Sequence, residues 1–226
     1  MTYRANSRWT RGIVAMLVCL GQLGWMSLAQ AQSSSGSDYT PTVGQPGKDV
    51  VWVPTPEDLV ERMLQMAQVG ARDVVMDLGS GDGRIAIAAS KRAAKAVGIE
   101  FNPDMVNLSR RNNTRDSGKA EFINGDVFKT DFSSATVLTM YLLPQLNMRL
   151  RPTILDMKPG TRISSHQFTM EDWEPDEVSY FDWRRAYHWI VPAKVQGAWM
   201  LEVAGSRFEV ELTQKFQIIE GTVRMY

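Results

Sequence analysis

A short stretch with three closely spaced glycines constrains the fold of this chain more than any other feature. Residues 77–84 read DLGSGDGR, after the apolar run 74–76 and before the helix-favouring run 85–89. This order predicts a buried strand, a tight turn and a helix, because glycines let the backbone turn sharply and approach a ligand closely. A dinucleotide fingerprint spaces its glycines differently, as G-x-G-x-x-G, and receives a pyrophosphate. Here Asp77 and Asp82 would repel a pyrophosphate and favour a cationic ligand without phosphate.

Two more acids stand at the ends of predicted strands farther along the chain. Residues 95–100 read as a second short strand that ends in Glu100, where an acid roughly 20 residues past the glycine turn accepts hydrogen bonds from ribose hydroxyls. Asn102 then has the character of a helix N-cap. A third strand, residues 120–124, runs towards Asp126. Because ligands of open α/β sheets bind beyond the carboxyl ends of the strands, the acids together predict one nucleoside-binding site.

The glycine motif resembles the first signature of class I S-adenosylmethionine-dependent methyltransferases. S-adenosylmethionine carries an ammonium and a sulfonium group, which suit the acid-rich turn. The resemblance implies that Glu100 contacts the ribose of this cofactor and that Asp126 contacts the adenine amino group. The cofactor-binding residues implied in this way are Asp77, Gly79, Ser80, Gly81, Asp82, Gly83, Glu100, Asn102, Asp126 and Val127.

Four segments narrow the resemblance. Within residues 51–170 the chain is similar to a family of lysine N-methyltransferases. The segments that carry this similarity are DLGSGDGRI, GIExNP, GDxF and the preceding P-T-P helix. The mitochondrial members of this family modify the c subunit of ATP synthase and the adenine nucleotide translocase. This implies a protein lysine as the methyl acceptor. Two other interpretations stay open. One is a non-catalytic envelope protein that binds adenosyl ligands, and the other is a nucleotide-dependent oxidoreductase, which the acid-rich turn disfavours.

Two residues on the predicted acceptor side are candidates for catalysis. Tyr141 follows a fourth strand, where it is equally suited to orient an acceptor nitrogen and to serve as an aromatic lid or core residue. His166 follows a fifth strand, where it is either a base or a hydrogen-bonded structural group. We expect no metal site, because Cys19 is the only cysteine and the chain has two histidines.

The remaining segments predict one α/β domain with a doubly wound, mostly parallel Rossmann-like sheet of seven strands. Thr55 is the predicted N-cap of the first core helix, with Pro56 at its first helical position. We expect the methyltransferase core to span residues 51–182. Residues 183–226 contain short antiparallel strands that complete or extend the sheet, predicted at 186–191, 198–203, 208–212 and 216–223.

The first 31 residues have the pattern of a secretory signal peptide. Three arginines precede an apolar run from residue 13 to residue 28, and Ala-Gln-Ala follows this run at residues 29–31. We therefore expect a periplasmic or otherwise exported protein without a transmembrane helix in the mature chain, followed by a flexible linker over residues 32–50. A mitochondrial leader and an uncleaved membrane anchor are the alternatives. Removing residues 1–31 leaves a net charge of −3, which does not favour a nucleic-acid partner.

Overall fold

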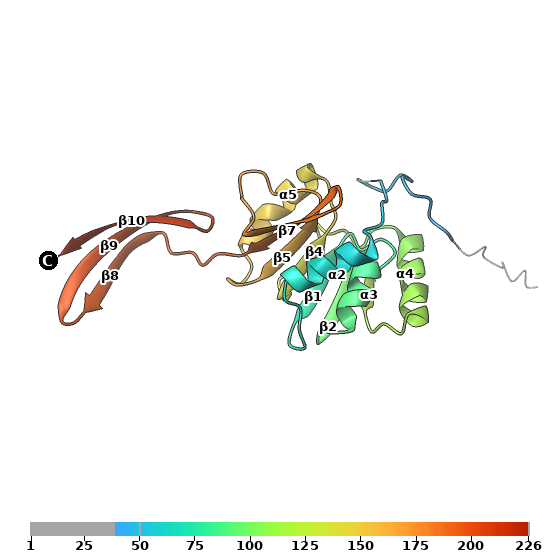
Figure 1. Cartoon of the computed structure of the whole chain (residues 1–226), viewed down its shortest axis with the longest axis horizontal. Helices are drawn as coiled ribbons and strands as arrows, with labels where there is room; N and C mark the ends of the chain where they lie inside the picture. Colours follow the sequence, from blue (N-terminus) through green and yellow to red (C-terminus); the bar gives the residue numbers. More distant parts are fainter. Residues whose placement is uncertain (1–38, 50, 226) are drawn as a thin grey trace, which may run out of the picture. The chain divides into compact units, whose positions relative to one another are not determined.

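A computed structural model describes residues 39–49 and 51–225. The predicted signal segment, residues 1–31, and the first part of the predicted linker lie outside the described residues. None of the described helices is long and apolar enough to cross a membrane. The described residues contain a seven-stranded sheet with helices and a separate three-stranded sheet (Figure 1).

The seven-stranded sheet has the strand order β3-β2-β1-β4-β5-β7-β6. The first five strands along the chain pair in parallel and β7 pairs antiparallel with β5 and β6. The predicted doubly wound, mostly parallel sheet is therefore confirmed. Its strands are β1 (Val74–Leu78), β2 (Lys95–Glu100), β3 (Glu121–Asn124), β4 (Val137–Met140), β5 (Arg162–His166), β6 (Glu177–Phe181) and β7 (Arg184–Ile190).

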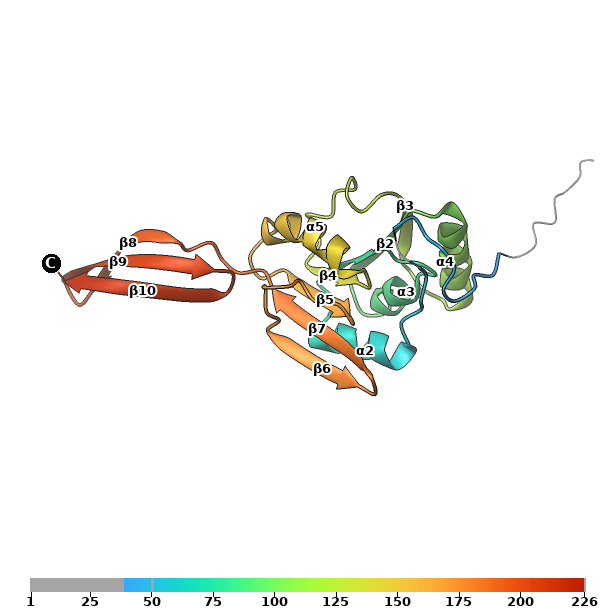
Figure 2. The same ribbon diagram turned by 90° about the horizontal axis from the view of Figure 1, so that it is seen from above.

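Helices cover both faces of this sheet. The helices are α2 (Glu57–Met66), α3 (Arg84–Ser90), α4 (Pro103–Arg115) and α5 (Pro144–Leu155). Apolar residues of α2, α3 and α4 form one core cluster against the sheet, and α5 belongs to a second cluster with Trp173 and Trp189. Figure 2 shows α2 and α5 on opposite sides of the strands. Burial on both faces explains why the central strands read as continuous apolar runs.

Two helix starts test the capping predictions. Asn102 caps α4 as predicted, since its side chain accepts a hydrogen bond from the Asp104 N–H at 2.9 Å. The predicted cap of α2 is wrong by one residue: Pro56 occupies the N-cap position, and no side chain caps this helix. Thr55 does not cap because its hydroxyl lies 2.9 Å from Nδ1 of His166 instead.

The C-terminal residues form more than one structure. Strands β6 and β7 make a hairpin at the edge of the main sheet, so the predicted core boundary at residue 182 falls in the turn of this hairpin. Strand β6 was not predicted from the sequence. Beyond this hairpin, β8 (Gly197–Val203), β9 (Ser206–Lys215) and β10 (Ile218–Met225) form their own antiparallel sheet instead of extending the first.

Candidate functional site

A cavity of about 330 Å³ lies where β1, β2, β3 and β4 end. This is the edge where ligands bind in open α/β sheets. Ten of the twelve predicted site residues line it, and they are Asp77, Gly79, Ser80, Gly81, Asp82, Glu100, Asn102, Asp126, Val127 and Tyr141. Gly83 and His166 do not line the cavity. The structure thus brings acids from the ends of three strands to one site.

The glycine turn leaves room for close packing at two different places. Gly81 has a φ of +53°, and a Cβ built on it would lie 2.9 Å from the Trp52 side chain. Gly83 has a φ of +85°, and its Cβ would lie 2.7 Å from Phe122 and from Ser109. The absence of a side chain at Gly81 therefore lets Trp52 pack against the turn. The absence of one at Gly83 lets the start of α3 pack against Phe122 and Ser109.

Asp77 is a nearly fully buried carboxyl at the end of β1, with 2% of its surface exposed. Its Oδ1 accepts a hydrogen bond from the Thr139 hydroxyl at 2.7 Å. Burial is the main cause that raises the pKa of Asp77 to about 7; the charges of Asp82 and Glu100 contribute to this rise, and the Thr139 bond opposes it. A cation in the cavity would favour the charged form of this carboxyl. Thr139 lies inside a buried strand and carried no sequence signal.

Glu100 shapes the backbone of the site. Its Oε2 accepts a hydrogen bond from the Gly81 N–H at 2.9 Å, and its Oε1 accepts one from the Asn102 N–H at 2.8 Å. One carboxylate thus ties the glycine turn after β1 to the start of α4. Bonds of this kind, between a charged group and backbone N–H groups, are stronger than neutral ones.

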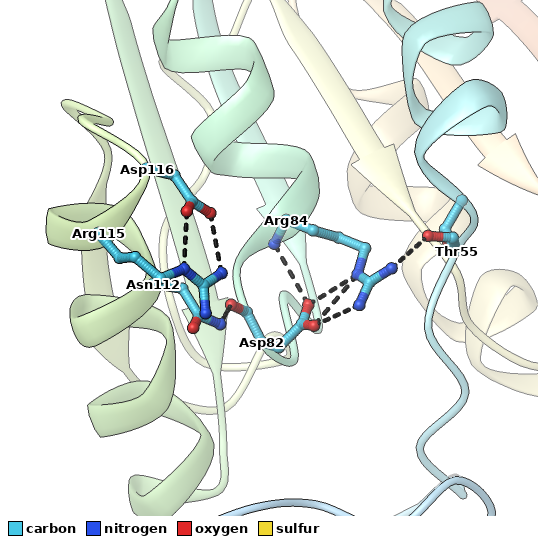
Figure 3. Close-up of polar contacts among 6 residues, drawn as sticks. All are labelled: Thr55, Asp82, Arg84, Asn112, Arg115 and Asp116. Atoms are coloured by element: carbon cyan, nitrogen blue, oxygen red, sulfur yellow. Dashed lines mark hydrogen bonds and ion pairs between the residues drawn. The ribbon is translucent and has the colours of Figure 1, made fainter.

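Asp82 is paired within the protein (Figure 3). Arg84 Nη2 lies 2.6 Å from its Oδ2, and Nη1 of the same guanidinium donates to the Thr55 carbonyl at 2.9 Å. The Asn112 side chain donates to the main-chain carbonyl of Asp82 at 2.9 Å. The charge of Asp82 is therefore matched by Arg84, whose own pKa the Asp82 carboxylate raises. This partner was not predicted from the sequence.

Asp126 contacts a lysine from the predicted linker. Lys48 Nζ lies 2.8 Å from Oδ2 of Asp126, and this contact is the main reason that the pKa of Asp126 is lowered. Lys48 also lies 4.4 Å from the centre of the Phe101 ring. Backbone hydrogen bonds between Gln45 or Gly44 and Trp52, at 2.9 and 2.8 Å, fold this segment along the cavity. A lone lysine in a Gly- and Pro-rich stretch gives no sequence signal.

The Tyr141 and His166 rings pack against each other, tilted by 33°, at the ends of β4 and β5. Their ring centres lie 3.8 Å apart, and Phe168 lies 5.9 Å from Tyr141. His166 is buried, and its Nδ1 is 2.9 Å from the Thr55 hydroxyl. Its Nε2 has no hydrogen-bond partner among the described residues. Burial lowers the pKa of His166 to about 4 and raises that of Tyr141, so both rings are neutral at pH 7.

The described residues contain no group of three His, Cys, Asp or Glu side chains placed to hold a metal ion. The cavity instead combines the buried Asp77 and the half-buried Asp82 and Glu100 on the β1–β2 side with aromatic and aliphatic side chains on the β4–β5 side. Such a site suits a ligand with a cationic part and an apolar reacting environment.

Comparison with known proteins identifies the family. A family model described as the ANTKMT methyltransferase domain matches residues 77–177. Over 134 residues the chain is 45% identical to a protein-lysine N-methyltransferase of Saccharolobus islandicus, a match that covers 57% of this chain and 83% of that protein. The chain belongs to this methyltransferase family. It is an S-adenosylmethionine-dependent methyltransferase, and the predicted resemblance is confirmed.

Two further relatives extend the comparison. The methyltransferase is 33% identical over 131 residues to the human lysine N-methyltransferase named for the C subunit of ATP synthase. That match covers 57% of this chain and 56% of the human protein. Among solved structures it is similar to an RNA methyltransferase from Salinibacter ruber in complex with S-adenosyl-L-homocysteine. The identity is 44%, the TM-score is 0.61, and the match covers 63% of this chain and 96% of that one.

Proposed function

We propose that this methyltransferase transfers the methyl group of S-adenosylmethionine to the side-chain nitrogen of a protein lysine. The observation that carries the proposal is the 45% identity to a protein-lysine N-methyltransferase over most of that protein's length. The matched region contains the glycine turn and its acids, which form the cavity described above.

The residues that line the cavity fit this cofactor. A Cβ added at Gly79 or Gly81 would lie 2.9 Å from a side chain of the cavity wall, so the turn has no space for larger residues. The Ser80 hydroxyl is buried without a partner among the described residues. In the proposal, Asp77 faces the cationic part of the cofactor while Glu100 and Asp126 hold the nucleoside. Bound S-adenosylmethionine supplies an electrophilic methyl group on a sulfonium, with a neutral thioether as the leaving group.

The acceptor side of the cavity favours a neutral amine. A lysine side chain is protonated in water at pH 7, with a pKa near 10.4, and an apolar environment lowers this value. Tyr141, Leu143 and Phe168 form such an environment at the ends of β4 and β5. In the proposal the lysine ammonium gives its proton to bulk water as it enters, because the apolar side chains favour the neutral amine, and the Tyr141 ring orients this amine.

His166 supports Tyr141 in this proposal and is a positioning residue, not a base. Its ring lies against Tyr141, and it does not line the cavity. With a pKa of about 4 it stays neutral over the physiological range. Its bond to Thr55 fixes the plane against which the Tyr141 ring packs.

RNA methylation is the second candidate, because the similar Salinibacter ruber structure is described as an RNA methyltransferase. The charge of the chain does not favour it. Residues 32–226 carry a net charge of −3, whereas nucleic-acid binding relies on an excess of basic groups. Protein lysine is therefore the acceptor that we propose.

The test offers both acceptors to the purified full chain together with methyl-labelled S-adenosylmethionine. The acceptors are a protein mixture, the same mixture with its lysines acetylated, and total RNA. We expect label in the first mixture alone, with mass spectrometry locating the methyl group on lysine. Label in RNA would replace lysine by RNA as the acceptor. Binding of S-adenosylhomocysteine without any transfer would favour the non-catalytic alternative.

A matched pair of variants controls this experiment. Glu100→Ala removes the carboxylate that binds two backbone N–H groups, and we expect it to weaken S-adenosylhomocysteine binding roughly 10- to 100-fold. Glu121→Ala removes an exposed acid that pairs with Lys95 at 3.0 Å, and we expect no change in binding.

We also propose that residues 1–31 direct export of the enzyme. Their three arginines, apolar run and Ala-Gln-Ala end support this. The intact mass of the protein recovered from expressing cells tests it. Loss of the first 31 residues would support the proposal, and their retention would contradict it.

A further inference from the structure

The three-stranded sheet has one largely apolar face. In antiparallel strands, residues paired across the ladder project to the same side. The register aligns Trp199 with Val210 and Val223, and Leu201 with Phe208 and Met225. We call this side the apolar face, and these six side chains form its centre.

Nothing in the described part of the chain covers this face. Val223 is 63% exposed, Met225 is 74% exposed, and Trp199 is 50% exposed. The opposite side of the sheet carries charges of both signs at Glu202, Arg207, Glu209, Glu211, Lys215, Glu220 and Arg224. An exposed apolar surface of this extent, on a sheet whose other side is solvated, marks an interaction site.

The polar atoms at the edge of the apolar face already have partners in the same chain. The Gln214 side chain accepts from the Val195 N–H at 2.8 Å and donates to the carbonyls of Ala193 and Phe216, both at 2.7 Å. The Trp199 indole N–H donates to the Val195 carbonyl at 2.6 Å. These polar groups need no hydrogen bond from a binding partner. The surface that covers this face is therefore expected to be apolar.

We propose that a second copy of this chain covers the apolar face, with the two three-stranded sheets packed face to face as in a β-sandwich. The same patch on both copies is self-complementary under two-fold symmetry, which is the commonest symmetry of homodimers. From strand spacing and rise, each face measures roughly 350 Å² in projection. Burying two such faces and their rims removes on the order of 1,000 Å² from water, which is the lower bound for a biological interface.

Charge argues for a second copy over a lipid surface. Amphipathic elements that bind membranes carry Lys and Arg on their polar side. Here the polar side carries four acids and three bases. The sheet also lies beyond residue 177, where the match to the family model ends. The interface is therefore an addition to the methyltransferase domain.

The sheet is anchored to the domain near the turn between β9 and β10. Phe216 stacks on Trp173 with ring centres 5.8 Å apart, and Lys215 lies 3.4 Å from Asp172. The Gln217 side chain donates to the Glu174 carbonyl at 2.8 Å. Pairing of two apolar faces thus joins two methyltransferase domains in one assembly.

Adjacent residues on opposite faces provide the test. Leu201→Glu places a charge on the apolar face, and Met200→Glu places the same charge on the polar face at similar exposure. In sedimentation equilibrium of the full chain we expect a dimer for the wild type and for Met200→Glu. For Leu201→Glu we expect a dimer dissociation constant at least 100-fold higher. Equal far-ultraviolet circular dichroism of the two variants and the wild type confirms that the three-stranded sheet is folded, and S-adenosylhomocysteine binding confirms that the methyltransferase domain is folded.

The wild type alone offers an independent measurement. In the dimer, Met225 on the apolar face should be protected from oxidation, while Met200 on the polar face should react freely. Protection of Met225 should disappear on dilution. A wild-type monomer, equal dimerisation of the two variants, or protection of Met225 only after addition of lipid vesicles would each overturn the proposal.

Discussion

The two sides of the cavity hold their polar groups in different ways. On the β1–β2 side, Glu100 accepts two backbone hydrogen bonds and Asp82 is paired with Arg84. On the β4–β5 side, His166 lies behind Tyr141 outside the cavity lining, with one nitrogen bonded to Thr55 and the other without a partner among the described residues. The first side is therefore shaped by charge-assisted bonds before any ligand arrives, whereas the second depends on the packing of neutral rings. This is the division expected between binding a charged cofactor and desolvating an acceptor.

The largest expected difference between the two sides is in the pH dependence of stability that Asp77 and His166 produce. Asp77 keeps its proton in the folded state up to about pH 7, so its contribution to stability is complete below its unfolded pKa and is lost as the pH rises through 7. His166 resists protonation down to about pH 4, so its contribution is complete above pH 6.5 and is lost as the pH falls through 4. Over the full pH range, the unfolding free energy changes by about 4 kcal/mol for Asp77 and by about 3 kcal/mol for His166.

Urea unfolding between pH 7.5 and 4.5 measures both contributions. Relative to the wild type, we expect the unfolding free energy of Asp77→Asn to fall more steeply as the pH drops, because the stabilising protonation of Asp77 is absent. We expect that of His166→Gln to fall less steeply. Curves for the two variants that run parallel to the wild type would show that neither group is buried as described.

The glycine turn provides the next largest effect. Gly83→Ala combines an unfavourable positive φ with a Cβ 2.7 Å from Phe122 and Ser109, and we expect it to lower the unfolding free energy by about 3 kcal/mol. Gly160→Ala is the matched control, since Gly160 has a φ of +88° and no atom within 4 Å of the added Cβ. It should cost about 1 kcal/mol, the conformational part alone. Equal losses in urea unfolding would mean that packing at Gly83 contributes nothing.

The fold was predictable because its signals are local. Strands β1, β2 and β4 are mostly buried on both faces and therefore appear as apolar runs, and glycines and acids mark the ends of β1 and β2. Strand β6 was missed because it is an edge strand whose residues are largely exposed, so it has no buried face to create a pattern. For β8 to β10 the strands were predicted, but local hairpin signals do not show whether such strands join the main sheet or form a sheet of their own.

The site was predictable only in part, for a related reason. Strand order alone brings the three acids at Asp77, Glu100 and Asp126 to one edge. The positions of residues in the sequence do not show which carboxylate a flexible arginine or lysine side chain contacts. The ion pairs of Asp82 with Arg84 and of Asp126 with Lys48 were therefore not predicted. Partners of this kind change the charge that a ligand would meet.

Thr55 contacts both sides of the cavity. Its substitution should give the smallest of these effects, a change in kcat without a change in cofactor affinity. Its main-chain carbonyl accepts from Arg84 on the cofactor side, and its hydroxyl bonds His166 on the acceptor side. Thr55→Val removes only the second contact. We expect a loss of about 1 kcal/mol, seen as a kcat roughly fivefold lower on the protein acceptor, with the Kd of S-adenosylhomocysteine unchanged. Thr55→Ser keeps the hydroxyl and should restore kcat. A weaker cofactor affinity in Thr55→Val, or no recovery in Thr55→Ser, would show that the two sides are not separable at this residue.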